Sequence, residues 1–494
     1  MGGTISAAGA ATGAHPVHHD RLYLGGRWVP PASDERIAVV SPSSEEVIAT
    51  VAAPAAPDAD AAVAAARASF ESGRWRRTPV PERIAAMRRL ADAYEARVPQ
   101  IGDILTSEMG AVTRWTRMVH AAGSVALIRA VCDDAERYPW EETRLGGAAS
   151  VIREAGGVVV AIPPWNVPQS TLLSKLIPAL LAGCSVVVKP SPETPLDALV
   201  LAELIDGLGL PEGVVSILPG GRDIGERLVA HREVDHVAFT GSTAAGRSIA
   251  AVCGRDLKRV TLELGGKSAA IVLDDADLDV VAAGLRASAF NISGQACIAQ
   301  TRVLAPRHRY REVVDALAGM VGGLRVGDPF DPSTDLGPLV SSVHRDRVRS
   351  YVRIGVAEGA RAVVGGADAP TGTDRGWYLR PTLFADVDNR MRIAQEEIFG
   401  PVLCVIPYDD DADAVGKAND SEYGLAGTVW TTDPARADAV AREVRTGMIG
   451  VNGFRPHFSM PFGGVKSSGI GREFGREGLD TFVEPKAYYH PLPA

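Results

Sequence analysis

Residues 234–246 read Val-Asp-His-Val-Ala-Phe-Thr-Gly-Ser-Thr-Ala-Ala-Gly. The part from Val234 to Phe239 is typical of a buried strand, and the Thr-Gly-Ser-Thr after it is typical of a tight turn that leads into a helix. Two earlier runs, Val158–Ile162 and Ser185–Val188, show the same order of strand, turn residues and helical stretch. Strands that alternate with helices in this way favour a parallel α/β sheet.

Helical patterns precede this region, and a second α/β cycle follows it. Asp58–Phe70 and Pro81–Arg97 carry apolar residues at helical spacing, with polar residues on the opposite face. Further on, Ala269–Leu273 and Thr301–Leu304 are predicted strands, and Leu278–Ala289 between them is a predicted helix. We therefore expect two α/β domains, and since no linker composition separates them, we expect them to be interwoven.

The composition narrows the class of protein. With 494 residues the chain exceeds what one hydrophobic core usually supports, and 46% hydrophobic residues are typical of a globular protein. The net charge of -9 includes no basic stripe, which argues against a nucleic-acid partner. Every long apolar run is broken by Pro, Gly or charge, so no membrane span is expected.

The five cysteines and the two ends of the chain carry weaker signals. The cysteines are scattered without paired spacing, which favours a reducing cytoplasm and predicts neither a disulfide framework nor a metal site. Residues 1–20 lack a basic region followed by an apolar core and are expected to form a disordered tail. Thr481–Tyr489 is strand-like without an obvious partner nearby, and such a strand often pairs with another subunit.

Three residues are candidates for nucleophilic chemistry. Cys297 follows a Gly-containing turn, although any single cysteine is more often an inert, buried hydrophobe than a nucleophile. Glu263 interrupts an apolar strand before a glycine pair, where apolar neighbours raise a carboxyl pKa; taken alone, a pair with Lys267 is the commoner interpretation. Asn166 lies among closely spaced prolines, where it is either an oxyanion donor or a turn asparagine.

Together these residues supply the parts of one reaction. A thiolate that attacks an aldehyde forms a tetrahedral oxyanion, which needs hydrogen-bond donors. Loss of hydride then leaves a thioester, which needs water and a base. For a redox cofactor, the turn Thr240-Gly241-Ser242 places backbone N–H groups at a helix start, where a pyrophosphate is favoured. The three-glycine dinucleotide fingerprint is missing, so an ordinary capped helix stays an alternative, as does a surface role for Lys189.

From about Tyr23 to its end, the chain resembles the aldehyde dehydrogenase superfamily. The resemblance is highly specific because seven motifs occur in the family's order. They are Pro164-Trp165-Asn166, Lys189-Pro190-Ser191, Phe239-Thr240-Gly241-Ser242-Thr243, Leu262-Glu263-Leu264-Gly265-Gly266-Lys267, Gly294-Gln295-Ala296-Cys297, Glu396-Glu397-Ile398-Phe399-Gly400-Pro401 and Pro461-Phe462-Gly463-Gly464.

The resemblance implies roles for particular residues. Cys297 is the implied nucleophile, Glu263 the base for the deacylating water, and Asn166 with the Cys297 N–H the oxyanion donors, with Lys175 also catalytic and Lys267 organising the site. Among the implied cofactor-binding residues, Ser242 contacts the pyrophosphate and Lys189 the adenosine ribose. Glu397 and Phe399 lie around the nicotinamide ribose and ring. The full implied set is Ile162, Pro163, Pro164, Trp165, Lys189, Ser191, Gly225, Phe239, Thr240, Gly241, Ser242, Leu264, Glu397 and Phe399.

One position departs from the family pattern and bears on the cofactor. Many members carry a Glu three residues after the lysine, where it binds the ribose hydroxyls and disfavours a 2′-phosphate. Here Pro192 stands at that position and Glu193 follows. Without that carboxylate the repulsion against NADP weakens, so NAD is the expected cofactor and use of NADP as well stays open.

The resemblance also implies a reaction branch and a substrate pocket. The presence of Glu263 favours hydrolysis to the free acid over the CoA-acylating branch. The pocket is implied to be mostly uncharged, and Val167 and Thr171 are smaller than the aromatic residues of some relatives. We therefore expect a roomy apolar tunnel for medium-chain or aromatic aldehydes, lined by Val167, Thr171, Ile298, Phe454, His457 and Phe462.

The implied fold has two interwoven Rossmann-like domains and a small β oligomerisation element, giving a homodimer or homotetramer. The expected parts are a cofactor-binding domain (21–131 and 151–261), a catalytic domain (262–456), a Gly-rich segment returning to the first domain (457–479) and the oligomerisation element (132–150 and 480–494). Two alternatives remain: a cysteine-dependent hydrolase or acyltransferase without a redox cofactor, and a non-catalytic binding protein of this fold.

Overall fold

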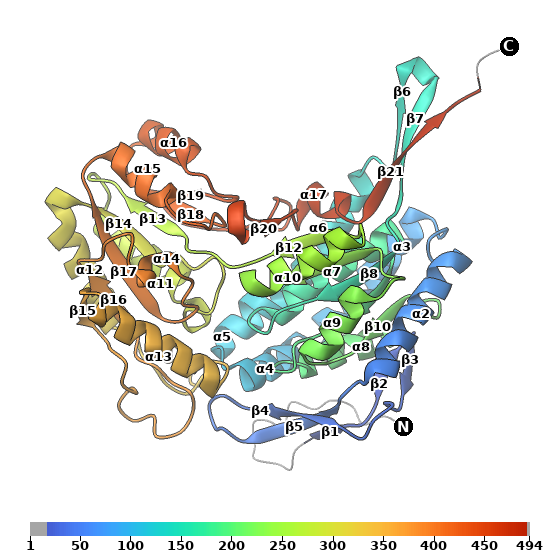
Figure 1. Cartoon of the computed structure of the whole chain (residues 1–494), viewed down its shortest axis with the longest axis horizontal. Coiled ribbons are helices and arrows are strands. Elements are labelled where there is room, and N and C mark those ends of the chain that lie inside the picture. Colours follow the sequence, from blue (N-terminus) through green and yellow to red (C-terminus); the bar gives the residue numbers. More distant parts are fainter. Residues whose placement is uncertain (1–16, 492–494) are drawn as a thin grey trace.

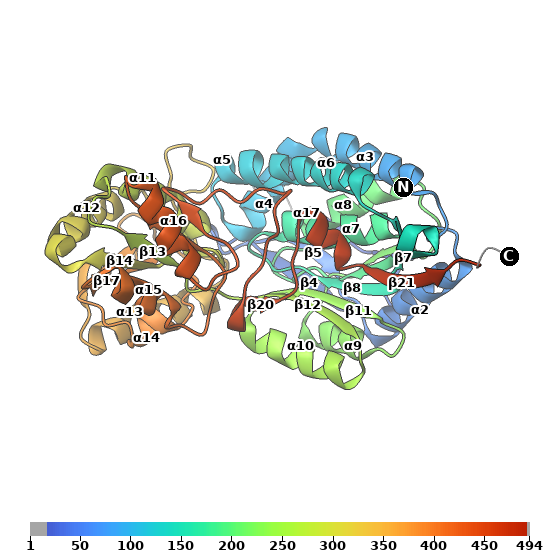
Figure 2. The same ribbon diagram turned by 90° about the horizontal axis from the view of Figure 1, so that it is seen from above.

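The computed structural model of the chain describes residues 17–491. Two large sheets lie side by side, each with helices on both faces, and Figures 1 and 2 show them as separate lobes joined by chain that crosses between them. Two small three-stranded sheets complete the fold. No helix within these residues is long and apolar enough to cross a membrane.

The first lobe contains the eight-stranded sheet, ordered β20-β12-β11-β8-β9-β10-β2-β3. The strands are β2 (Leu22–Leu24), β3 (Arg27–Val29), β8 (Val158–Ile162), β9 (Ser185–Val188), β10 (Val215–Ile217), β11 (His236–Thr240), β12 (Arg259–Glu263) and β20 (Gly469–Ile470). The helices of this lobe are α2 (Ala56–Ser72), α3 (Val80–Glu95), α4 (Val98–Met109), α5 (Thr113–Trp115), the π-helix η1 (Thr116–Ala121), α6 (Ala122–Arg137), α7 (Pro168–Ala182), α8 (Leu196–Asp206), α9 (Arg222–Ala230), α10 (Thr243–Arg255) and α17 (Gly475–Asp480).

Side-chain alternation along the strands gives this sheet two buried faces. Val158 and Val160 pack in one core with α2 and α9, whereas Val159 and Ala161 pack in another core with α3, α6, α7 and α8. Successive residues of a strand point to opposite faces, so a strand covered on both sides must be apolar throughout. This explains why the predicted strands Val158–Ile162 and Ser185–Val188 are confirmed with their predicted bounds.

The second lobe contains the seven-stranded sheet, ordered β15-β16-β17-β14-β13-β18-β19. The strands are β13 (Ala269–Val272), β14 (Arg302–Pro306), β15 (Arg361–Val364), β16 (Thr382–Ala385), β17 (Val402–Tyr408), β18 (Gly427–Trp430) and β19 (Gly450–Val451). The helices are α11 (Leu278–Ala289), α12 (Tyr310–Gly322), α13 (Ser342–Ala357), α14 (Arg392–Gln395), α15 (Asp411–Asn419) and α16 (Pro434–Glu443). Short 3-10 turns along the chain are η2 (Leu145–Gly147), η3 (Asn291–Gly294), η4 (Arg307–Arg309) and η5 (Lys466–Ser468).

Two segments connect the lobes to each other. The chain leaves β12 and enters β13 through residues 264–268, and near its end β20 returns to pair antiparallel with β12. In the sequence, the second lobe therefore lies between two connecting segments, and both meet the first sheet at the same edge. Both segments carry glycines, Gly265-Gly266 and Gly469, which let the backbones approach closely.

The structure corrects one expectation about the ends of the chain and adds the partner strand that the other lacked. Of the residues 1–20 expected as a disordered tail, 1–16 lie outside the described part, but Val17–His19 form β1, which pairs with β5 (Val47–Ala52) and, through it, joins β4 (Arg36–Val40). The strand near the C-terminus does have a partner within the chain: β21 (Val483–Tyr489) pairs antiparallel with β7 (Ala149–Ala155).

The small sheet β21-β7-β6 projects from the first lobe (Figure 1). Its third strand is β6 (Glu141–Arg144). Cys132, which we expected at the start of an oligomerisation element, instead lies in the last turns of α6 and is fully buried. Its apolar neighbours at helical spacing extend the helix through Arg137, which is why the β element begins later.

Candidate active site

Cys297 lies in a tightly turned loop that follows α11. Ile292, Ser293 and Gly294 all have positive φ (51°, 55° and 75°), a conformation that side chains other than glycine adopt rarely. A Cβ on Gly294 would lie 2.3 Å from the carbonyl oxygen of Gly400, so only glycine fits there. The loop is held from within, because the side chain of Gln295 donates to Ile292 O at 3.0 Å and accepts from Val340 N at 3.0 Å.

Asn166 reaches this loop from the first lobe. It follows β8 and precedes α7, and its side chain is buried. Its Nδ2 donates a hydrogen bond of 2.8 Å to the backbone carbonyl of Gln295, two residues before Cys297. An amide nitrogen has a second hydrogen to donate, so Asn166 can serve an oxyanion at the cysteine. The alternative interpretation, a turn asparagine, accounts for the place of Asn166 in the bend before α7 but not for its hydrogen bond to the cysteine loop.

Glu263 is the last residue of β12, and the segment that follows it contacts the loop of Cys297. A Cβ on Gly266 would lie 2.4 Å from the carbonyl oxygen of Cys297, so the segment after Glu263 touches the cysteine loop. Both carboxylate oxygens of Glu263 are buried and have no hydrogen-bond partner among residues 17–491, and the same holds for Lys267 Nζ. The alternative in which Glu263 simply pairs with Lys267 is therefore wrong.

Burial changes the acidity of both groups. It raises the pKa of Glu263 well above its ordinary value, and the carboxylate of Glu473 adds to that effect while Lys175 and Arg472 oppose it. Burial raises the pKa of Cys297 to about 12, with the carboxylates of Glu397 and Glu263 adding to the effect. The thiol is therefore protonated at neutral pH and needs a base, which Glu263 can provide in its ionised form. The four other cysteines are fully buried.

Lys175 takes part in a buried polar network beside Glu263. Its side chain is 1% exposed and its Nζ donates to the carboxylate of Glu473 and to Thr240 Oγ1 at 2.6 Å. Ser174 Oγ donates to the same carboxylate at 2.7 Å. Sequence reasoning missed Glu473, because nothing local connects it with a lysine 298 positions earlier.

A cavity of about 720 Å³ lies along the carboxyl ends of β8, β9 and β11, a volume in the range of cofactor pockets. Of the predicted cofactor-binding residues, Leu264, Glu397 and Phe399 lie outside its lining. The others line it, namely Ile162, Pro163, Pro164, Trp165, Lys189, Ser191, Gly225, Phe239, Thr240, Gly241 and Ser242. It is also lined by Pro192, Glu193 and the first turns of α9 and α10.

The floor of this cavity fits a dinucleotide. A Cβ on Gly241 would lie 2.4 Å from the ring of Phe239, so a side chain there would have to displace that ring, whereas glycine keeps the backbone of the turn open to the cavity. Ser242 caps α10 by accepting from Ala245 N at 3.3 Å, and the uncapped N–H groups of that turn remain for a phosphate, so a capped helix and a phosphate site are compatible here.

Lys189 and Glu193 frame the other end of the cavity. Lys189 is buried, contrary to the surface alternative, and its Nζ donates to Gly220 O at 2.6 Å and to Pro190 O at 3.0 Å. Burial lowers its pKa to about 8. Ser191 Oγ donates to the carboxylate of Glu193, and both residues line the cavity.

Glu397 and Phe399 lie in one loop of the second lobe, against the glycine pair. Glu397 Oε1 accepts from Gly266 N at 3.0 Å, and burial raises the pKa of this carboxyl to about 7. The ring of Phe399 meets Trp165 edge-on at 5.5 Å. His344 was not predicted: its Nε2–H donates to Phe399 O at 2.7 Å and its ring packs on Trp165 at 5.5 Å, which joins the two lobes.

A second cavity, of about 680 Å³, is formed largely by one chain segment, residues 447–457. Of the residues expected in the substrate pocket, Phe454, His457 and Phe462 line this cavity, and Val167, Thr171 and Ile298 do not. Thr171 is turned back onto its own helix, where its hydroxyl donates to Val167 O at 2.6 Å. The lining also includes aromatic and apolar side chains that the sequence did not single out, namely Met448, Ile449, Val451, Met460 and Phe474.

With this geometry established, comparison with known proteins identifies the class. The model of the aldehyde dehydrogenase family matches residues 28–488, and the chain belongs to this family. A relative from Castellaniella defragrans, named geranial dehydrogenase, is 48% identical over 96% of this chain and 99% of its own length. A 3-succinoylsemialdehyde-pyridine dehydrogenase from Pseudomonas sp is 40% identical over 94% of this chain and 97% of its own.

Solved structures agree. The chain resembles a Mycobacterium tuberculosis aldehyde dehydrogenase complexed with NAD+ (TM-score 0.94, 45% identity, covering 96% of this chain and 99% of that one). It also resembles a mutant of aldehyde dehydrogenase C from Pseudomonas syringae, complexed with NAD+ and octanal (TM-score 0.93, 39% identity, 96% and 98% covered). The predicted fold is confirmed, and the protein is an NAD-dependent enzyme that oxidises an aldehyde.

Proposed function

We propose that this enzyme converts an uncharged medium-chain or aromatic aldehyde to its carboxylic acid through a thioester on Cys297. The observation that supports this most is the meeting of three segments at one loop. The amide of Asn166 donates to the carbonyl of Gln295, and the Gly266 backbone, just after Glu263, touches the carbonyl of Cys297. A nucleophile, an oxyanion donor and a base thus come from three separate elements.

The acylation half begins with a proton transfer. Glu263 accepts the proton of the Cys297 thiol, and Sγ attacks the aldehyde carbon to give a thiohemiacetal whose oxyanion is held by Asn166 Nδ2 and the Cys297 N–H. Bound NAD supplies the hydride acceptor in this reaction, for which the cavity along β8, β9 and β11 fits. Loss of the hydride from the same carbon leaves the acyl group on Sγ as a thioester.

The deacylation half uses the same glutamate again. After passing its first proton to solvent, Glu263 takes a proton from a water molecule, whose oxygen attacks the thioester carbon. The C–S bond breaks, the acid leaves, and Sγ recovers a proton. The ion pair of Lys175 with Glu473 controls how readily Glu263 ionises, because the two charges act on its pKa in opposite directions. Lys175 is in this view a positioning residue.

The chemistry of the site speaks against the other interpretations. A cysteine hydrolase or acyltransferase without a redox cofactor would have no use for the cavity that Lys189 and Gly241 border. Transfer to coenzyme A instead of water would not need Glu263 to activate a water molecule in the second half of the reaction, and its buried carboxyl has no other partner among the described residues. A non-catalytic binding protein would need none of the three reactive side chains.

The second cavity and the relatives both support the proposed class of substrate. Phe454, Phe462 and Phe474 line the cavity together with several aliphatic side chains, which favours an uncharged chain or ring. Two similar proteins act on or bind uncharged aldehydes by their names, one geranial and the other octanal. Because Val167 and Thr171 lie outside the lining, selectivity is assigned to residues 447–462 and not to the start of α7.

NAD is the cofactor, and we propose that NADP is a poorer second choice. Pro192 removes the usual ribose-binding glutamate, but Glu193 brings a carboxylate into the same cavity. A negative charge there repels a 2′-phosphate.

We further propose that the chain works in the cytoplasm as a homodimer or homotetramer. All five cysteines are unpaired, as in a reducing compartment. β21 lies at the edge of its sheet with Tyr489 74% exposed, so its outer hydrogen-bonding groups are open to a second copy. Light scattering on the wild type and on Tyr489→Pro tests this, because a dimer built on the β21 edge is weakened by the variant.

The function is tested by following absorbance at 340 nm with hexanal, benzaldehyde and acetaldehyde. Wild type should reduce NAD with higher kcat/KM for the two larger aldehydes than for acetaldehyde, and Cys297→Ala should be inactive while still binding NAD. Activity in Cys297→Ala equal to wild type would exclude the thioester. Higher kcat/KM for acetaldehyde or a charged semialdehyde would exclude the proposed substrate class.

A further inference from the structure

Residues 447–457, here called the wall segment, form one side of the second cavity. Every residue of this segment lines the cavity. Among residues 17–491, no hydrogen bond holds positions 453–456, and at the far end His457 bonds only locally, to Ser459 and Met460. The position of Phe454 therefore depends on how the segment is held where it leaves β19.

That end is a sharp turn at Asn452. β19 pairs with β18 through Gly450 and Val451, and Asn452 N continues the ladder by donating to Val429 O at 2.9 Å. Asn452 then adopts a φ of 51° and Gly453 a φ of 145°. The turn brings the chain back on itself, because a Cβ on Gly450 would lie 2.0 Å from the carbonyl oxygen of Gly453. Asparagine is one of the few residues that tolerates such a φ.

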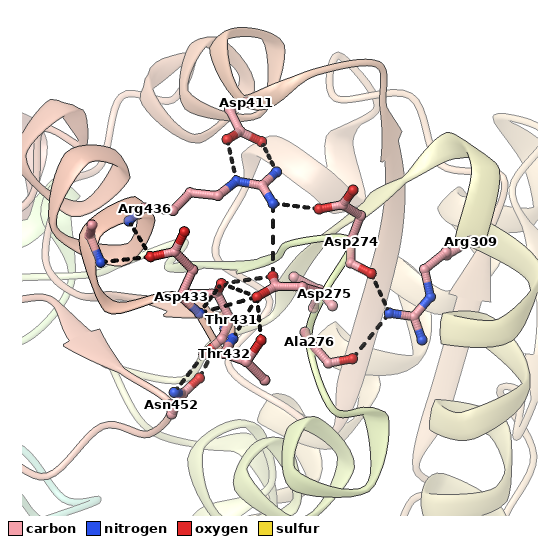
Figure 3. A network of polar contacts seen from close by, with 12 residues as sticks. Asp274, Asp275, Ala276, Arg309, Asp411, Thr431, Thr432, Asp433, Arg436 and Asn452 are labelled. Carbon is pink, nitrogen blue, oxygen red and sulfur yellow. Dashed lines mark hydrogen bonds and ion pairs between the residues drawn. The ribbon is translucent and has the colours of Figure 1, made fainter.

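The side chain of Asn452 makes the hydrogen bonds that the backbone of the next residue pair would make if the sheet continued. Its Oδ1 accepts from Thr431 N at 3.0 Å and its Nδ2 donates to Thr431 O at 2.8 Å (Figure 3). Both backbone groups of Thr431, just past the end of β18, are thus paired with one amide. The backbone after Asn452 therefore does not need to continue beside the chain that follows β18, and it turns into the wall segment.

Thr431 is fixed in its turn by Asp275, as Figure 3 shows. The carboxylate of Asp275 accepts from Thr431 Oγ1 at 2.7 Å, from Thr432 N at 2.8 Å and Thr432 Oγ1 at 2.6 Å, and from Asp433 N at 3.1 Å. Burial acts to raise the pKa of Asp275, but these hydroxyl and backbone donors bring it down to about 2. The carboxylate therefore stays charged, and the anchor stays formed, throughout the neutral range.

The guanidinium of Arg436 makes further contacts around Asp275. It pairs with the carboxylates of Asp411 and Asp274 and lies 3.8 Å from Asp275. Arg309 in turn donates to the backbone carbonyls of Asp274 and Ala276. These contacts join the turn after β13 to α15 and α16, so Asp275 cannot shift without moving several elements.

We propose that Asn452, anchored through Thr431 on Asp275, is a positioning residue that sets selectivity for large over small aldehydes. The inference rests on the proposed substrate class. A long or aromatic aldehyde contacts the wall segment, whereas acetaldehyde has no atoms beyond the reacting carbon and one methyl group. Loss of the anchor therefore weakens transition-state binding of the large substrates and leaves the small one unchanged.

The test compares kcat/KM for hexanal and acetaldehyde in wild type and in Asn452→Ala and Asn452→Gly. The glycine variant keeps the φ of 51° without strain and loses only the amide. We expect the ratio of hexanal to acetaldehyde to fall about tenfold in both variants, which corresponds to two neutral hydrogen bonds. KM for NAD and kcat/KM for acetaldehyde should stay within about twofold of wild type. Asp275→Asn should move the ratio in the same direction.

Asp433→Ala is the matched control. Its carboxylate also makes two bonds to backbone N–H groups, of Ala435 and Arg436, but it caps α16 and does not hold the wall segment. It should lose stability without a change in the ratio. A ratio unchanged in both Asn452 variants, or an equal fall for both aldehydes, would overturn the role of Asn452. A wild type that does not prefer hexanal would instead contradict the proposed substrate class.

Discussion

The buried pair of Lys175 and Glu473 gives two variants with opposite expected effects on Glu263. Lys175→Met removes a positive charge that lowers the pKa of Glu263, and Glu473→Gln removes a negative charge that raises it. We expect the pH at which deacylation reaches half its maximum to rise in the first variant and to fall in the second. An elementary charge at such close range moves a carboxyl pKa by about one to three pH units.

The same variants have a stability cost that can be worked out. Both side chains are almost fully buried, 1% and 6% exposed, so removing either charge leaves the other without its partner. Such a change costs about 3–5 kcal/mol. For a chain of 494 residues the entropy of unfolding is about 1 kcal/mol/K, so Tm falls by about 3–5 °C. The double variant, with no charge left in the pair, should recover part of this loss.

The assay is kcat for hexanal against pH, with NADH formation followed at 340 nm. Lys258→Met is the matched control, because Lys258 is a similarly buried lysine that donates to the carbonyls of Val229 and His231 at the other end of the sheet. It should lower Tm and leave the midpoint where it is. Midpoints that move in the same direction in Lys175→Met and Glu473→Gln would refute the reasoning, since opposite charges cannot act alike.

Three further predictions concern other parts of the site and the core. Asn166→Ala should lower kcat by about a hundred- to a thousandfold, the usual effect of losing one oxyanion donor; pre-steady-state NADH formation measures it, and a fall of less than about threefold contradicts the role. Glu193→Gln should raise kcat/KM for NADP about fivefold relative to NAD, because it removes a like charge from the cofactor cavity; an unchanged ratio contradicts it. Burial raises the pKa of Glu108 well above its ordinary value and that of Asp197 to about 7, so the folded state holds a proton that the unfolded state releases. The contribution of Asp197 to stability is therefore complete below about pH 4 and is lost as pH rises through about 7, so Tm should fall less between about pH 6 and pH 8 in Asp197→Asn than in wild type; parallel curves contradict it.

Features encoded in local sequence were predicted from it. The apolar runs of β8 and β9 and the amphipathic pattern of α11 were found with their bounds, because a strand with two buried faces and a helix with one each leave a local pattern. The family and its fold followed from motifs that are short and contiguous. For the same reason Cys297, Glu263 and Asn166 could be selected before their distances were known.

Features that depend on distant parts of the chain were not predicted. The resemblance grouped 132–150 with 480–494, but nothing in Thr481–Tyr489 itself specifies that β21 pairs with β7, more than 300 positions earlier. The link between Lys175 and Glu473 is of the same kind. Val167 and Thr171 were placed in the substrate pocket by resemblance, but they do not line the cavity formed by residues 447–462. β1 was not predicted because three residues are too few to show an alternation of apolar and polar side chains.

The central claim is that an acyl group is carried by Cys297 and released by Glu263. The most direct test is the intact mass of Glu263→Gln after mixing with hexanal and NAD, followed by peptide mapping. Because Glu263 also accepts the thiol proton, the account predicts that one equivalent of NADH and one hexanoyl group per chain, located on Cys297, form more slowly than in the first turnover of wild type. The acyl group should then persist while wild type turns over. Steady turnover by Glu263→Gln at the wild-type rate, or an acyl group on any other residue, would contradict it.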